Sequence, residues 1–314
     1  MSAPSPVPPS TTAPQPLHTP PHNPMRAALW MTGAITAFSA MAISVRELQG
    51  AHDTFEIMAA RSAVGLLIVA AVALATGQLK DVRTNRLGGH VLRNAIHFTG
   101  QNLWILAVTL IPLAQVFALE FTAPVWVLVL SPLLLGEKIT RPRLVAAVLG
   151  FVGILIVARP NVQTLNVGVV AAAASAICFA LTNISTKVLT RHEGIVSILF
   201  WLTLMQLVLG CVLALWDGVV RWPTAASLPW LVAIGVTGLA AHVCLTSALR
   251  LASASFVMPI DFIRLPVIAV AGMVLYGESV DAAVLVGAAV IFAGNYINVW
   301  SETRRLPGQK PSQS

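Results

Sequence analysis

Charged residues are scarce in this sequence. They make up 10% of its 314 residues, whereas soluble domains carry about 25%. Hydrophobic residues, in contrast, make up 57% of the chain. A soluble protein could not cover so much apolar surface with so few charges, so the composition excludes an ordinary soluble domain and indicates a membrane protein.

Cysteines and catalytic motifs are equally sparse. The three cysteines, Cys178, Cys211 and Cys244, lie in apolar runs without CxxC spacing, and we expect them to be packing residues rather than a disulfide framework or metal site. HExxH, GxSxG and GxxxxGK[ST] motifs are absent from the sequence. Although the net charge is +7, no basic stripe with interleaved aromatic residues is present, which argues against a nucleic-acid partner. We expect neither a cofactor nor enzymatic activity.

Long apolar runs dominate the rest of the chain. A bilayer core of ~30 Å needs about 20 apolar residues per helix. By this measure the sequence predicts an all-α integral membrane protein of about ten transmembrane helices. The expected spans are 26–46, 54–76, 88–108, 112–135, 142–159, 166–187, 195–216, 228–249, 252–276 and 281–300.

Lysine and arginine residues predict the orientation of these spans. They gather in alternate loops, as at Lys80, Arg83 and Arg86, and in the segment after the last span. Positive charge concentrates on the cytoplasmic side, so we expect a multi-pass protein of the cell inner (plasma) membrane with both termini cytoplasmic. The Pro/Ser-rich segment 1–25 and the polar segment 301–314 are expected to be disordered tails.

The sequence also contains an internal repeat. The pair Gly136-Glu137 in LLLGEK recurs as Gly277-Glu278 in VLYGES, an offset of 141 residues. Many other positions match at this offset without a gap, and each half holds about five spans. An odd number of spans inverts the second half in the membrane. We therefore expect two inverted five-helix repeats, 26–160 and 161–300, an arrangement typical of secondary transporters.

Two acidic residues correspond across the repeat. Glu120 lies in the apolar stretch VFALEFTAPVWVLVL, and the same offset places Asp261 in the second half. Each is ~12 Å along its span, close to the bilayer midplane. Arg264 follows Asp261 at i+3 and can pair with it, so the pair could be purely structural. Charged groups at this depth cost ~2.5–3.5 kcal/mol, which makes all three candidate substrate-binding residues and Glu120 a candidate proton carrier.

Further polar and aromatic residues lie within the spans. Gln101 and Asn102 are on the third span, and Gln101 corresponds to His242 at the offset of 141. Asn183 lies within the sixth span and Trp126 near the middle of the fourth. All five are candidate substrate-binding residues. Hydrogen bonding between helices, worth ~0.6 kcal/mol per contact, is the structural alternative for the polar ones.

With these features the sequence resembles the EamA-type family of the drug/metabolite transporter superfamily. The stretches that carry the resemblance are PLAQVFALEFTAPVWVLVLSPLLLGEKITRPRLVAAVLGFVGILIVARP and SASFVMPIDFIRLPVIAVAGMVLYGES, with Pro124, Gly136-Glu137, Gly150 and Gly153 matching the family pattern. The resemblance implies an inner-membrane carrier with two inverted five-helix units. The motifs Ala146-x-x-x-Gly150 and Ala283-x-x-x-Gly287 suit close helix packing, either within the chain or in a homodimer through helices five and ten.

Together these observations favour a secondary transporter of a small organic metabolite. Its substrate would be an amino acid, cofactor or drug-like solute, moved by alternating access and with proton coupling as a hypothesis. A membrane-embedded enzyme or a channel-like protein that uses Glu120 and Asp261 is the alternative. The symmetric acids lie within one chain, whereas channel pores are built from several subunits or rings of like charge, so a carrier is favoured.

Overall fold

The computed structural model describes residues 23–48, 51–82, 84, 86–111, 113–158, 166–216, 221–277 and 282–304. The tails predicted at 1–25 and 301–314 lie largely outside these residues, and Glu278 lies outside them as well. Over the described residues every regular element is helical, in agreement with the predicted all-α fold.

The helices divide into two halves. The first half contains α1 (Pro24–Glu47), α2 (Thr54–Ala75), the short 3-10 helix η1 (Gln78–Val82), α3 (Leu87–Leu110), α4 (Leu113–Glu120), α5 (Ala123–Leu135) and α6 (Arg141–Ala158). The second contains α7 (Val167–Leu189), α8 (Ile195–Ala214), α9 (Leu228–Leu251), α10 (Ala254–Val257), the 3-10 helix η2 (Met258–Ile263), α11 (Arg264–Tyr276) and α12 (Ala282–Arg304).

Six helical stretches among the described residues are long and apolar enough to cross a membrane. They are 24–47, 54–75, 167–189, 195–214, 228–251 and 254–275. Large apolar side chains cover the outer surface, as with Leu67, Leu133 and Val274, which are at least 70% exposed. Such a surface is stable against lipid rather than water.

Proline interrupts the helices at corresponding places in the two halves. Because Pro124 lacks an N–H group, it cannot donate to the carbonyl of Glu120, and the helix breaks between α4 and α5. Pro259 cannot donate to Ser255, and the chain there winds as the 3-10 helix η2 between α10 and α11. Both α5 and α11 then end at a glycine with φ +66°, Gly136 and Gly277, a left-handed conformation that favours glycine.

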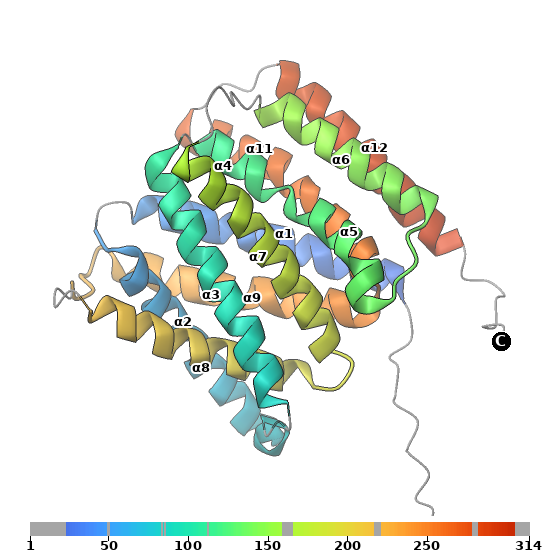
Figure 1. Ribbon diagram of the computed structural model, residues 1–314. Helices are drawn as coiled ribbons and strands as arrows, with labels where there is room; N and C mark the ends of the chain where they lie inside the picture. The colour runs from blue at the N-terminus through green and yellow to red at the C-terminus, as the bar shows by residue number, and fades with distance from the viewer. Residues whose placement is uncertain are drawn as a thin grey trace, which may run out of the picture.

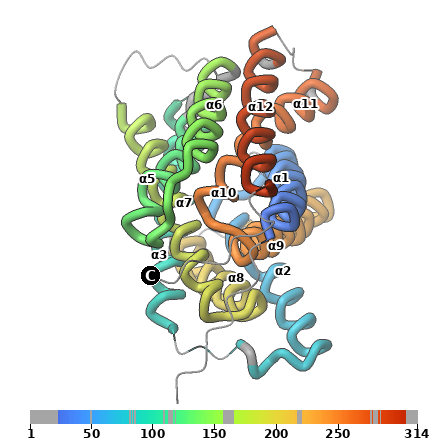
Figure 2. The backbone as a smooth tube through the Cα atoms, turned by 90° about the vertical axis from the view of Figure 1, so that its right-hand side faces the viewer, coloured from blue at the N-terminus to red at the C-terminus, as the bar shows by residue number. Residues whose placement is uncertain are grey.

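The two halves pack as a twofold-related pair. Helix α1 packs on α9 and α3 packs on α7, so each of these contacts is the repeat-related copy of the other (Figure 1). Helices α2 and α8 pack together, as do α6 and α12, which lie side by side at the upper edge of the view in Figure 2. A twofold relation between the repeats produces this set of partners.

Glycines allow α6 and α12 to approach closely. A Cβ atom on Gly153 would lie 2.6 Å from Ile291 Cγ1 and 2.8 Å from the carbonyl oxygen of Gly287. Gly294, which corresponds to Gly153, faces Leu149 and the backbone of Ala146 in the same way. Of the small residues predicted to mediate helix packing, Ala146 and Gly287 lie in this contact within the chain, whereas a Cβ atom on Gly150 would meet the ring of Phe262 in η2.

The first and last described helices begin and end on the same side of the molecule. The backbone N–H of Asn23, before α1, donates to the carbonyl of Leu251 at the end of α9. Near the end of α12, Glu302 pairs with Arg143, which also donates to Ser255 at the start of α10. The start of α1 and the end of α12 therefore both lie near the α9–α10 junction, and we call this side the terminal face.

Candidate functional site

A cavity of about 800 Å³ lies between the two repeats. Its lining residues come from α1, α2, α3, α7, α9, the α4–α5 segment and the η2–α11 segment. The cavity extends to the connection between α1 and α2, where Leu48, His52 and Thr54 line it. Because α1 begins at the terminal face and its 24 residues span ~36 Å, this end of the cavity lies on the opposite face.

A three-residue ion-pair network occupies one wall of the cavity. Arg264 Nη2 lies 3.1 Å from Glu120 Oε1 and 3.0 Å from Asp261 Oδ2. Trp104 Nε1 donates to the second oxygen of Glu120 at 2.7 Å. Glu120 ends α4 and Asp261 lies in η2, so the interrupted helix of each repeat contributes one carboxylate. The structure thus brings together the three charged residues that the sequence predicts for the site.

Aromatic rings surround this network. The guanidinium carbon of Arg264 lies 4.8 Å from the ring centre of Phe121 and 5.4 Å from that of Phe38, both within range of a cation–π interaction. Phe117 packs on Phe121 and on Trp104, with ring centres 6.4 and 6.1 Å apart. The cavity wall therefore offers flat apolar surfaces beside fixed charges.

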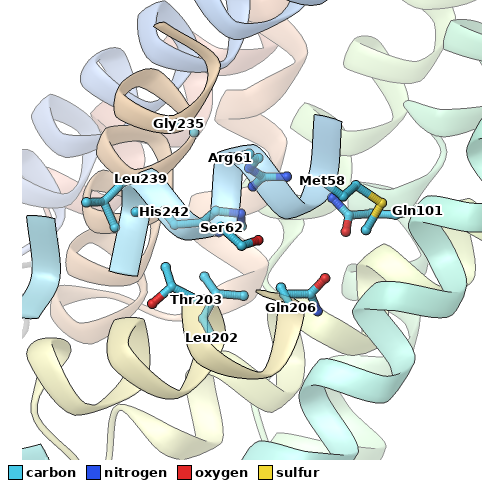
Figure 3. Close-up of a pocket in the computed structure, with 12 residues that line it drawn as sticks. Met58, Arg61, Ser62, Gln101, Leu202, Thr203, Gln206, Gly235, Leu239 and His242 are labelled. Carbon is cyan, nitrogen blue, oxygen red and sulfur yellow. The ribbon is translucent and has the colours of Figure 1, made fainter. Parts of the chain in front are cut away.

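A second polar group lies across the cavity. His97 of α3 and His242 of α9 face each other with ring centres 5.5 Å apart, and Phe38 lies 5.7 Å from His242. Arg61 of α2 and Gln101 of α3 line the same cavity. Arg61, Gln101 and His242 also border a separate hollow of about 20 Å³, enough for one water molecule (Figure 3).

Some of the remaining predicted site residues line the cavity, and others do not. Asn183, Gln101 and His242 line the cavity. Asn102 is not among the lining residues, and its side chain donates to the carbonyl of Phe98 on its own helix. Trp126 is also absent from the lining and is 39% exposed. The structure therefore gives neither Asn102 nor Trp126 access to the cavity.

Sequence reasoning missed Arg61 as a site residue. Arg61 lies seven residues into α2, ~10 Å along the helix, and lines the cavity. Its depth in an apolar span is the signal that could have identified it.

Polar contacts close the terminal face below the cavity. We call Glu137, Arg143, Lys187, Ser255 and Glu302 the polar seal. Glu137 accepts hydrogen bonds from the backbone N–H of Ser255 at 3.1 Å and from its hydroxyl at 2.7 Å, and thereby caps α10. Arg143 pairs with Glu302 at 2.7 Å and donates to Ser255, while Lys187 donates to the carbonyls at the end of α9.

Glu193 joins three elements at the terminal side. It lies between α7 and α8 and accepts hydrogen bonds from Thr84, from His90 at 2.9 Å and from Ser197 at 2.7 Å. Burial by itself raises the pKa of Glu193, but these hydrogen bonds outweigh burial and hold the pKa below its ordinary value. The ionised form therefore stabilises the junction of α3, α7 and α8.

A known protein family matches nearly all of the helical region of the chain. The model of the EamA-like transporter family matches residues 25–159 and again residues 166–300, an offset of 141 residues between the matches. This is the offset at which Glu120 and Asp261 correspond.

Individual relatives are similar over most of their length. A riboflavin transporter of Vibrio cholerae is 29% identical over 291 residues, which cover 90% of this chain and 96% of that protein. A riboflavin transporter of Brucella anthropi is 30% identical, covering 69% and 78% of the two chains. An S-adenosylmethionine uptake transporter of Rickettsia conorii is 23% identical, covering 90% and 96%.

A solved structure shares the fold. The structure, described only as "Crystal structure of protein", superposes with a TM-score of 0.75 at 18% identity and covers 90% of this chain and 99% of its own. The helical halves, the cavity between them and the repeated family match lead to one conclusion: the chain belongs to the EamA-like transporter family and is a membrane transporter of small metabolites.

Proposed function

We propose that the protein is a secondary transporter that binds a small organic solute in the 800 Å³ cavity and moves it by alternating access. The observation that carries this proposal is the network of Glu120, Arg264 and Asp261. Each repeat supplies one buried carboxylate from its interrupted helix, and both face the same cavity. Buried charges that border a cavity inside a membrane protein are typical of substrate pathways.

The proposal includes a transmembrane topology. Counting α4–α5 and α10–η2–α11 as one interrupted span each gives ten crossings and inverted repeats. Ten crossings place both termini on one side, and the start of α1 and the end of α12 lying on one face supports this topology. The distribution of lysine and arginine favours the cytoplasm for this face and the inner membrane for the protein.

Alternating access accounts for the difference between the two ends of the cavity. The cavity reaches the face opposite the termini, whereas the polar seal holds the terminal face closed. In the proposed topology the structure is therefore open to the outside. Breaking the contacts of Glu137 and Arg143 would open the cytoplasmic side, and the opposite end would close.

The relatives suggest solutes for a first test. Riboflavin and S-adenosylmethionine combine a flat heterocycle with polar groups, and the aromatic walls and charged network of the cavity suit solutes of that kind. Both are moved rather than converted, so we propose no enzymatic activity. Coupling to protons through Glu120 stays a hypothesis, because Arg264 and Trp104 already bind its carboxylate.

A homodimer through α6 and α12 also stays a prediction. Gly153 of α6 and Gly294 of α12 already face the partner helix within the chain. A second copy would therefore have to pack on their outer faces, where Val148 and Leu285 are exposed.

Counterflow in proteoliposomes tests the proposed function. Liposomes that contain the purified protein are loaded with unlabelled riboflavin or S-adenosylmethionine, and entry of the labelled compound is measured. A carrier gives saturable entry that is faster when the same solute is inside. Flux that rises linearly with concentration and ignores the internal solute would indicate a channel, and chemical conversion of the solute would indicate an enzyme. Asp261→Asn tests whether any flux depends on the cavity network.

A further inference from the structure

We propose that the cavity takes a zwitterionic solute, with its carboxylate held at Arg61 and its ammonium group held at Asp261. This inference rests on the proposed function and adds the chemical class of the substrate. It follows from two opposite charges that the protein itself leaves unbalanced on two sides of one cavity.

The network side carries an excess negative charge. Glu120 and Asp261 supply two carboxylates, whereas Arg264 supplies one guanidinium group. Asp261 Oδ1 is buried and has no hydrogen-bond partner, although Oδ2 of the same carboxylate binds Arg264. A buried carboxylate oxygen without a donor is costly, and an ammonium group of a solute would supply that donor.

The opposite side carries an excess positive charge. Among the described residues, Arg61 has neither an ion pair nor a hydrogen-bond partner, and an arginine side chain is permanently charged. Arg93 of α3 is a second buried positive charge, and it donates to Thr186 and Asn94 rather than to a carboxylate. A carboxylate matches the two-pronged donor geometry of a guanidinium group better than any neutral acceptor.

Unsatisfied polar atoms lie on the same side as Arg61. Gln101 Oε1 and His97 Nδ1 are buried without a hydrogen-bond partner, and the His97 residue is only 7% exposed. Figure 3 shows Gln101 and His242 on either side of Arg61, around the hollow that they share. These groups can orient a polar solute group that binds Arg61.

The network lies a short distance from His242, which lines the cavity and the small hollow together with Arg61. The ring of Phe38 lies 5.4 Å from the guanidinium carbon of Arg264 and 5.7 Å from the ring centre of His242. The network and the histidines are therefore separated by at most about 11 Å, the sum of these two distances. A solute of metabolite size can reach from the network past Phe38 to the histidines beside Arg61.

A neutral solute would leave both charges unbalanced when the cavity closes. Closure removes water, and unpaired charges are most costly where water is absent. A solute with one carboxylate and one ammonium group neutralises both sides at once. Such a solute also leaves the net charge of the closed cavity unchanged, so no additional charge has to cross the membrane interior with it.

Matched probes test the proposal in purified wild-type protein. S-adenosylhomocysteine carries one ammonium and one carboxylate group on an adenosine. Its decarboxylated analogue lacks only the carboxylate, and its deaminated analogue lacks only the ammonium group. We expect wild-type protein to bind S-adenosylhomocysteine about ten- to a hundredfold more tightly than either analogue, because each lost contact is a charge-assisted hydrogen bond. Binding is measured by calorimetry, with riboflavin as the uncharged probe.

Variants identify the residue that binds each charged end of the solute. Arg61→Gln should bind S-adenosylhomocysteine and the decarboxylated analogue equally, whereas Arg61→Lys should keep part of the preference. Asp261→Asn should abolish the preference over the deaminated analogue only. Arg86→Gln removes an exposed arginine outside the cavity and should behave as wild type. Monodisperse elution of each variant excludes misfolding as the cause.

The outcomes separate this inference from the proposed function. Equal affinity of wild-type protein for all three adenosine compounds would overturn the inference, as would an unchanged preference in Arg61→Gln. Binding of riboflavin without binding of any adenosine compound would also overturn it and leave the transporter proposal standing. Absence of both binding and flux for every probe would count against the proposed function itself, and the inference would fall with it.

Discussion

Replacing Arg264 with glutamine removes the only cation of the ion-pair network. Arg264 contacts Glu120 at 3.1 Å and Asp261 at 3.0 Å, and all three side chains are at most 15% exposed. In Arg264→Gln two carboxylates would remain in a largely apolar region without a counter-charge. Their desolvation would no longer be offset, and they would repel each other.

The expected loss of stability is large. Removing one partner of a buried ion pair costs ~3–5 kcal/mol, and here one residue serves two carboxylates. A change of 1 kcal/mol shifts the unfolding midpoint by ~2–4 °C in chains of 150–250 residues, so the midpoint should fall by about 6–20 °C. The triple variant Glu120→Gln, Asp261→Asn, Arg264→Gln carries no charge at these positions and should recover much of this loss.

Thermal unfolding in detergent, followed by intrinsic tryptophan fluorescence, measures both variants against wild type. Unfolding of membrane proteins is often irreversible, so all samples are heated at one fixed rate. A midpoint of Arg264→Gln equal to that of wild type would refute the reasoning. A triple variant less stable than Arg264→Gln would refute it as well, because the lost charges would then not be the cause.

Three further predictions concern other parts of the molecule. The pKa of Glu193 is below its ordinary value in the folded protein, so its contribution to stability is present at pH values above the pKa of the unfolded chain and is lost as the pH falls through the pKa of the folded protein. Glu193→Gln should therefore lower the unfolding midpoint at pH 7 and make the midpoint fall less steeply in acid. An unchanged pH profile would contradict this. Gly153→Leu should lower the free energy of unfolding by at least ~1–3 kcal/mol, because its Cβ would lie 2.6 Å from Ile291 Cγ1. As the control, Gly88→Ala should be neutral, because a Cβ on Gly88 meets nothing within 4 Å. Equal unfolding midpoints for the two variants would be inconsistent with the close packing of α6 on α12. If Glu120 carries a proton, Glu120→Gln should transport at a rate independent of pH, and a wild-type pH dependence in that variant would rule the proton carrier out.

The sequence was sufficient to predict the all-α class, the family repeat and the correspondence of Glu120 with Asp261 across it. These features depend on composition and on an offset between equivalent positions, both of which can be read along a single chain. The sequence pattern pairs Arg264 with Asp261 on its own span, and the structure shows that Arg264 also reaches Glu120 of the other repeat. That contact depends on the packing of α5 and α6 against η2, which a sequence pattern does not specify.

Side-chain direction accounts for the site residues that sequence reasoning placed differently. Asn102 and Gln101 are adjacent in the chain, yet only Gln101 lines the cavity, because successive residues of a helix point about 100° apart. Trp126 lies six residues after Glu120 and beyond the break at Pro124, and its side chain is on the outer surface. Phe38 and Arg61 become site residues only because α1 and α2 both pack on α9 beside the cavity.

Crosslinking of the polar seal tests alternating access most directly. Glu137 and Ser255 contact each other at 2.7 Å at the terminal face, and both are replaced by cysteine in a protein whose native Cys178, Cys211 and Cys244 are changed to alanine. A short bifunctional thiol reagent then joins the two positions, and counterflow is measured before and after crosslinking. The account predicts that crosslinked protein still binds solute from the face opposite the termini but no longer transports it, while each single-cysteine variant transports with or without the reagent. Full transport by completely crosslinked protein would contradict the account.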